Sequence, residues 1–240
     1  MNVAGMDEPE AIAKRLDSVL RAIRAAELRW NRAPGSVTLL AVSKTHGADA
    51  IRRCIQAGQR QFGENQLQEA LGKMEMLKEQ HLTWHFIGAI QSNKTRGIAE
   101  RFDWVHSVDR LKIAQRLSAQ RPRHLPPLNI CLEVNVSGES SKAGVAPSAL
   151  PALADAVAQL PGIQLRGLMS VPAPAMEFDA QRRPFRTLHT LLVALNERGF
   201  DLDTLSMGMT DDMTAAIAEG ATVVRVGTAI FGPREAIPKL

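Results

Sequence analysis

The chain has 240 residues, of which 45% are hydrophobic and 22% are charged, a composition typical of a folded globular protein rather than a disordered one. This length suits a single α/β barrel, a fold that commonly takes about 250 residues. No apolar run approaches the roughly 18 residues of a transmembrane helix, and the N-terminal stretch lacks the apolar segment of a secretory signal. We therefore expect a cytoplasmic protein with no membrane partner.

The charge, aromatic and cysteine content exclude three further classes: nucleic-acid-binding, disulfide-rich and metal-binding proteins. The net charge is +4, but the basic residues are scattered, and aromatic residues make up only 4% of the chain, with no tyrosine. Surfaces that bind single-stranded nucleic acid combine a basic groove with aromatic side chains for base stacking, so we expect no nucleic-acid partner. Cys54 and Cys131 lie far apart and form no CxxC pair, which predicts neither a disulfide framework nor a metal site.

The first predicted element is a helix within residues 1–34, with Ile12, Leu16, Val19, Leu20 and Ile23 on one face. After it, eight short apolar runs, rich in β-branched residues, alternate with segments of helical period. The runs cover residues 38–43, 61–63, 84–88, 104–108, 128–134, 165–171, 204–207 and 223–226.

Strands that alternate with helices pair in parallel through right-handed crossovers. Eight such units predict a closed (β/α)8 TIM-type barrel over residues 38–234, with the helix of residues 1–34 as an addition, in a single domain of residues 1–240. The alternative is an open, doubly wound sheet. No strand is followed by the GxGxxG or GxxxxGK[ST] motif that nucleotide-binding members of that class carry.

Lys44 is the sharpest candidate among the polar residues at the predicted strand ends. The active site of such a barrel is built where strands end and βα loops begin. Lys44 directly follows the first apolar run, LLAVS, so we expect its amine at the mouth of the barrel. A lysine that is desolvated and lies near other cations has a lowered pKa and forms Schiff bases readily. The alternative is a lysine that extends from a strand end into solvent.

A second cluster follows the last two predicted strands and consists of Ser206, Gly208, Gly227 and Thr228. Barrel enzymes often bind phosphate with these loops and a helix N-terminus, and we expect a short helix capped by Thr210 to supply free N–H groups. Gly227 would let the backbone approach a phosphate, and the hydroxyls of Ser206 and Thr228 would donate to it. The alternative is a set of ordinary turn residues. A Schiff-base lysine and a phosphate site on one rim are more specific together than either is alone.

Arg225 lies inside the last predicted strand, where an unpaired charge is costly. A guanidinium facing the pyridine nitrogen of pyridoxal 5'-phosphate (PLP) would explain it, because PLP proteins place Asp or Arg there. The alternative is an internal ion pair with Glu133 or Glu64. Asn65, at the end of the second predicted strand, could bind the phenolic oxygen of the cofactor. The alternative is an ordinary turn residue, because Asn is common in turns. His85 is included as a candidate, with a hydrogen-bonded core histidine as the alternative.

The chain contains, in this order, AVSKT, FGENQLQE, WHFIGAIQSNK, EVNVSGESSKAGV, RGLMSVPAP, LSMGMTDD and VRVGTAIFG. These seven motifs resemble the pyridoxal phosphate homeostasis protein family, whose barrel is similar to the N-terminal domain of alanine racemase. The resemblance covers residues 38–234, nearly the whole chain.

The resemblance implies a role for each candidate. The Schiff-base lysine of the family corresponds to Lys44, its arginine facing the pyridine nitrogen to Arg225, and its asparagine near the ring to Asn65. Where the family often has a second lysine, this chain has His46, so we expect no second amine beside the first. The family's phosphate-binding residues correspond to Ser206, Gly227 and Thr228.

The resemblance also implies a monomeric or weakly associating protein that carries PLP and balances its free level without established catalytic turnover. PLP-dependent apoenzymes are candidate partners. One alternative is a PLP-dependent amino-acid racemase, but racemisation needs a base on each face of the cofactor. Racemases with a similar barrel use a tyrosine as the second base, and this chain has none. The other alternative is a Schiff-base aldolase acting on a sugar phosphate, with Lys44 as its nucleophile and no coloured cofactor.

Overall fold

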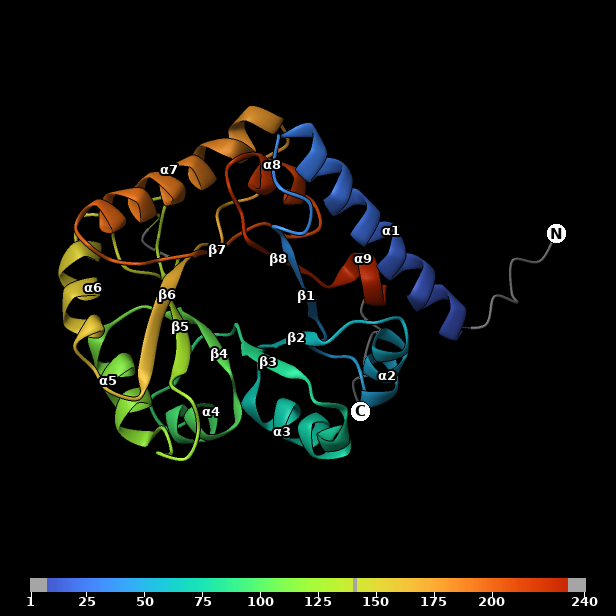
Figure 1. Cartoon of the computed structure of the whole chain (residues 1–240), viewed down its shortest axis with the longest axis horizontal. Helices are drawn as coiled ribbons and strands as arrows, with labels where there is room; N and C mark the ends of the chain where they lie inside the picture. The colour runs from blue at the N-terminus through green and yellow to red at the C-terminus, as the bar shows by residue number, and fades with distance from the viewer. Residues whose placement is uncertain (1–7, 140–141, 233–240) are drawn as a thin grey trace.

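A closed barrel of eight parallel strands in the order β1-β2-β3-β4-β5-β6-β7-β8 forms the centre of the molecule, and helices surround it (Figure 1). The computed structural model describes residues 8–139 and 142–232, so the predictions for residues 1–7, 140–141 and 233–240 lie outside the described residues. Strand β1 pairs with β8 and closes the barrel, which confirms the predicted (β/α)8 fold and excludes the open doubly wound sheet.

The strands of the barrel are short, and their bounds follow. They are β1 (Thr38–Val42), β2 (Gln61–Glu64), β3 (Thr83–Phe86), β4 (Trp104–Val108), β5 (Leu128–Glu133), β6 (Ile163–Met169), β7 (Thr204–Ser206) and β8 (Val223–Val226). Several predicted strands differ from these by one or two residues at an end. An apolar run marks residues that face the core, whereas a strand ends where pairing with its neighbours ends.

The described helices follow the strands in alternation, after one helix that precedes the barrel. They are α1 (Glu8–Arg29), α2 (Ala48–Gln56), α3 (Leu67–Met76), α4 (Thr95–Arg101), α5 (Leu111–Gln120), α6 (Leu150–Ala158), α7 (Phe178–Glu197), α8 (Met213–Ala218) and α9 (Thr228–Phe231), with a short 3-10 helix at Lys78–Gln80. None of these helices is both long and apolar enough to cross a lipid bilayer.

Helix α1 lies along one side of the barrel and packs against α2, α8 and α9 (Figure 1). Its predicted apolar face is confirmed, because Ile12, Leu16, Val19 and Ile23 are buried and Leu20 is partly buried against the core. The side chain of Arg15 adds a polar tie, since its Nε donates to the carbonyl oxygen of Ile230 at 2.7 Å. The helix that precedes the barrel is thereby fixed to the element that follows the last strand.

The helix after β7 begins two residues later than predicted. Helix α8 starts at Met213 with Asp212 at its N-cap position, so the prediction that Thr210 caps it is wrong. The carboxylate of Asp212 instead accepts the N–H of Met209 at 2.6 Å, which orders the turn in front of the helix. Thr210 lies in that turn, among several residues that could each cap a helix by sequence alone.

Candidate functional site

A cavity of about 290 Å³ lies at the carboxyl ends of β1 and β8, and it brings four of the predicted site residues together. These are Lys44, Arg225, Gly227 and Thr228. We call this cavity the upper pocket. The segment after β7 closes it from a third side, and the His46 ring stacks on Phe231 of α9 with 4.9 Å between centroids. The rest of the lining is Val42, Thr45, His46, Ile87, Met209, Thr210, Asp211 and Gly232.

Arg225 is buried at the floor of the upper pocket and is held by oxygen atoms of the barrel. Its Nη1 donates to the carbonyl oxygen of Ser206 at 2.6 Å and to the Ser206 hydroxyl at 2.8 Å, and its Nη2 donates to the carbonyl oxygen of Ser170 at 2.9 Å. Burial lowers the pKa of Arg225 to about 10, although the carboxylates of Asp212 and Glu133 oppose this shift. The guanidinium is therefore a fixed cation at neutral pH.

Two glycines of the predicted cluster allow close packing around the upper pocket. Gly208 has a φ of +92°, and a Cβ atom there would lie 2.5 Å from the Cβ of Ala216. Its carbonyl oxygen accepts the Arg225 N–H at 2.9 Å, which ties the loop after β7 to β8. A Cβ atom at Gly227 would lie 3.1 Å from the carbonyl oxygen of Val42. Both positions therefore favour glycine for the space that it leaves.

Ser206 lies deeper in the barrel than its predicted role requires. It has no exposed surface, and its hydroxyl contacts Arg225 and the Nδ1 atom of His106, the latter at 2.7 Å. The Nε2 atom of His106 lies 2.9 Å from the Nδ1 atom of His85. An interior chain of hydrogen bonds thus runs from Arg225 through Ser206 and His106 to His85.

His85 lies at the far end of this chain and not beside Lys44. It lines a different cavity of about 440 Å³ at the amino-terminal ends of the strands, which we call the lower pocket. Burial lowers the pKa of His85 to about 3 and lowers the pKa of His106 well below its usual value, so both rings are neutral at pH 7. The structure does not bring His85 together with the lysine.

Asn65 lies next to the upper pocket rather than in it. It lines an adjacent cavity of about 290 Å³ with Phe86 and Lys94, while Ile87 lines the upper pocket. Within the part of the chain that the structure describes, the buried Oδ1 of Asn65 has no hydrogen-bond partner. An amide can present either its oxygen or its NH₂ by rotation, so this group is available to a polar ligand.

Sequence reasoning missed the contacts of two buried residues, His106 inside the barrel and Lys73 between α3 and the barrel. The ammonium of Lys73, on α3, is buried against Glu64, and Glu64 also accepts a hydrogen bond from Ser43 instead of pairing with Arg225. His106 was available from the sequence, because alternate residues of β4 face the barrel interior. Lys73 was not, because a lysine within a helix is normally exposed.

Comparisons with known proteins identify the family to which the chain belongs. The family described as "Alanine racemase, N-terminal domain" matches residues 19–235. A protein of Pseudomonas aeruginosa named "Pyridoxal phosphate homeostasis protein" is 62% identical over 93% of this chain and 96% of its own length. A protein of the same name from Escherichia coli K12 is 52% identical over 93% of this chain and 97% of its own length.

Solved structures with a similar fold lead to the same family. PipY of Synechococcus elongatus, solved with PLP bound, is 40% identical, with a TM-score of 0.81 over 92% of this chain and all of that one. Alanine racemase of Corynebacterium glutamicum, at 17% identity and a TM-score of 0.67, shares the fold over 96% of this chain and 63% of that one. The chain therefore belongs to the alanine racemase N-terminal domain family, where it groups with the pyridoxal phosphate homeostasis proteins, as its motifs predicted.

Proposed function

We propose that this protein binds PLP in the upper pocket through a Schiff base on Lys44 and buffers or delivers the cofactor. The observation that carries the proposal is the lining of one cavity by a lysine, a buried guanidinium and the start of α9. A cavity near the lower end of the usual range for ligands, about 300–1,000 Å³, suits a small cofactor. The names of the relatives and the PLP bound to PipY support the same ligand.

Each end of the cofactor has a partner in this proposal. The uncharged amine of Lys44 adds to the cofactor's aldehyde carbon, a C=N bond replaces the C=O bond, and one water molecule leaves. When bound, PLP supplies a reactive aldehyde and an electron-withdrawing ring. Gly227 and Thr228 bind its phosphate through the first N–H groups of α9, which have no partner within the helix, and through the exposed Thr228 hydroxyl.

The remaining candidates act around the ring. Arg225 faces the pyridine nitrogen and, since it cannot accept a proton, keeps that nitrogen neutral. Asn65, whose buried Oδ1 has no partner within the described residues, rotates its amide so that the NH₂ group donates to the phenolic oxygen. Ser206 and His85 contribute through the interior chain that holds Arg225, while Gly208 fixes the loop that faces the phosphate.

The experiment is a visible spectrum of the purified protein before and after borohydride reduction. We expect a yellow protein whose reduction fixes a phosphopyridoxyl mass on Lys44. Lys44→Ala should be colourless, and Lys112→Ala, at an exposed position on α5, should match the wild type. Full retention of a borohydride-fixed adduct by Lys44→Ala would refute the covalent assignment. A colourless wild-type protein that forms a borohydride adduct with a sugar phosphate would favour the aldolase.

A carrier role without turnover is part of the same proposal. A racemase needs a second base on the opposite face of the ring, and the chain has no tyrosine for this task. We expect negligible conversion of L-alanine to D-alanine by the PLP-loaded protein, and a robust rate would establish the racemase instead. Transfer of PLP to a PLP-dependent apoenzyme, followed by the apoenzyme's recovered activity, tests delivery.

We also propose that the protein is cytoplasmic and monomeric. Cell fractionation tests the location, and size-exclusion chromatography with light scattering tests the state. A stable dimer at micromolar concentration would contradict the second proposal.

A further inference from the structure

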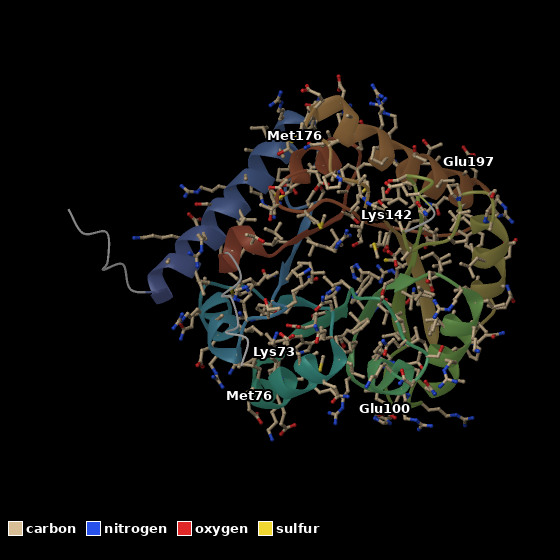
Figure 2. The ribbon with its side chains drawn as sticks, turned by 180° about the vertical axis from the view of Figure 1, so that it is seen from behind. Lys73, Met76, Glu100, Lys142, Met176 and Glu197 are labelled. Atoms are coloured by element: carbon tan, nitrogen blue, oxygen red, sulfur yellow. The ribbon has the colours of Figure 1, made fainter. Side chains whose placement is uncertain are left out.

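A buried ion cluster lies beneath the turn that carries Lys44. The ammonium of Lys73 donates to Oε1 of Glu64 at 2.7 Å, to Oε1 of Glu69 at 2.6 Å and to the carbonyl oxygen of Ser43 at 2.8 Å. These three acceptors match the three protons of an ammonium. In Figure 2, Lys73 lies toward the middle of the molecule, whereas Met76, one turn later on the same helix, lies at its periphery. The cluster therefore lies between α3 and the ends of β1 and β2, not on the outer surface of α3.

The two carboxylates of the cluster reach both neighbours of Lys44. Oε1 of Glu64 accepts the hydroxyl proton of Ser43 at 2.6 Å, and Oε1 of Glu69 accepts the backbone N–H of Thr45 at 2.7 Å. The residue before Lys44 thus contacts the cluster through its hydroxyl and its carbonyl oxygen, and the residue after it through its N–H. The backbone on each side of the lysine is held by hydrogen bonds to charged groups, which are the strong ones.

The backbone at Thr45 shows why such support is needed. Its φ is +68°, a conformation that β-branched residues rarely adopt. The turn is tight, since the N–H of His46 donates to the carbonyl oxygen of Ser43 at 3.0 Å. A strained conformation of this kind persists only where the surrounding structure holds it, and it is typical of functional sites.

We propose that Lys73 and Glu69, together with Glu64, are positioning residues that hold the Lys44 amine at the angle needed to reach the cofactor's aldehyde. This inference rests on the proposed function of Lys44. Stability alone is a poor reason for the cluster, because well-packed apolar residues often replace buried ion pairs at no cost. The contacts on both sides of the reactive lysine give the cluster a geometric task that apolar side chains cannot perform.

The test compares two substitutions of Glu69, whose side chain is 27% exposed, so that neither change opens the core. Glu69→Gln keeps an oxygen that can accept the Thr45 N–H, and Glu69→Leu removes it. Glu75→Leu, at an exposed position of the same helix, is the matched control. The first readout is the rate at which visible absorption develops when apo-protein is mixed with PLP. The second is the affinity for pyridoxamine 5'-phosphate, which fits the same pocket but has no aldehyde.

We expect Glu69→Leu to slow Schiff-base formation about tenfold, the loss typical of one charge-assisted hydrogen bond, and Glu69→Gln to lie within about threefold of the wild type. Affinity for pyridoxamine 5'-phosphate should stay unchanged in both variants and in the Glu75→Leu control. A wild-type rate for Glu69→Leu would overturn the proposal. An equal loss of pyridoxamine 5'-phosphate affinity would also overturn it, because the cluster would then support the whole pocket rather than the lysine.

Lys73→Met provides a second variant, checked for native circular dichroism before use. It should show the same slow reaction with PLP and the same unchanged pyridoxamine 5'-phosphate affinity. If the proposed function itself is wrong, the result differs, because borohydride reduction of the wild type would then give no adduct on Lys44. An adduct on Lys44 that forms at the same rate in wild type, Glu69→Leu and folded Lys73→Met would refute the positioning role alone.

Discussion

Ser206→Ala separates two roles for this residue, a direct bond to phosphate and support of Arg225 from below. The substitution removes two buried hydrogen bonds, one to the Arg225 guanidinium and one to Nδ1 of His106. A bond to a charged group contributes about 1.5–3 kcal/mol and a neutral one about 0.5–1.5 kcal/mol. Because Nη1 of Arg225 keeps its bond to the Ser206 carbonyl oxygen, we take the lower part of these ranges. The free energy of unfolding should fall by about 2 kcal/mol.

The assay is urea unfolding of the apo-protein, followed by titration with PLP. Ser18→Ala, at an exposed position of α1 where the hydroxyl bonds a helix carbonyl, is the control and should change stability by less than about 0.5 kcal/mol. We expect the free energy of PLP binding by Ser206→Ala to weaken by less than the free energy of unfolding falls, because Arg225 keeps two carbonyl contacts. Unchanged apo-protein stability with a loss of PLP affinity worth about 1.5–3 kcal/mol would refute this reasoning and make the hydroxyl a phosphate ligand.

Three further predictions follow from the described geometry. The pKa of His85 is about 3 in the folded state and 6.5 as its ordinary value, so its contribution to stability is present above pH 6.5 and lost as the pH falls toward 3. The free energy of urea unfolding should fall less between pH 7 and pH 5 for His85→Gln than for the wild type. Thr45→Gly removes the strain of a φ of +68°, and thermal unfolding should show a gain of up to about 1 kcal/mol. If residues 1–240 form one domain, calorimetry should show one cooperative transition, and two separate transitions would contradict it.

The sequence was sufficient to predict the barrel and the position of Lys44, and the physical reason is the same for both. A run of buried apolar residues must end where the chain leaves the sheet, and in a parallel barrel all such ends lie on one face. The same logic placed Gly227 and Thr228 in the upper pocket with the lysine. The positions of these residues can be predicted because they depend only on where their own strand ends and on the parallel direction of all the strands.

The sequence was insufficient where a side chain depends on the register between strands. His85 pairs with Gly63 of β2 and sits one residue before the end of β3, so its ring faces the lower pocket instead of the rim. Ser206 ends β7 with its hydroxyl turned into the barrel, toward His106 on a distant strand. Lys73 reads as a surface lysine because nothing near it in sequence shows that Glu64 and Ser43 lie beneath α3.

The interior chain has a direction that the cation at its upper end imposes. Arg225 can only donate, so Ser206 accepts its proton and turns its own hydroxyl proton toward Nδ1 of His106. The neutral His106 ring then carries its proton on Nε2 and donates a hydrogen bond to Nδ1 of His85, so the neutral His85 ring carries its own proton on Nε2. One guanidinium therefore selects the tautomer of two imidazoles, and the N–H at the far end of the chain, on Nε2 of His85, is buried and has no hydrogen-bond partner within the described residues.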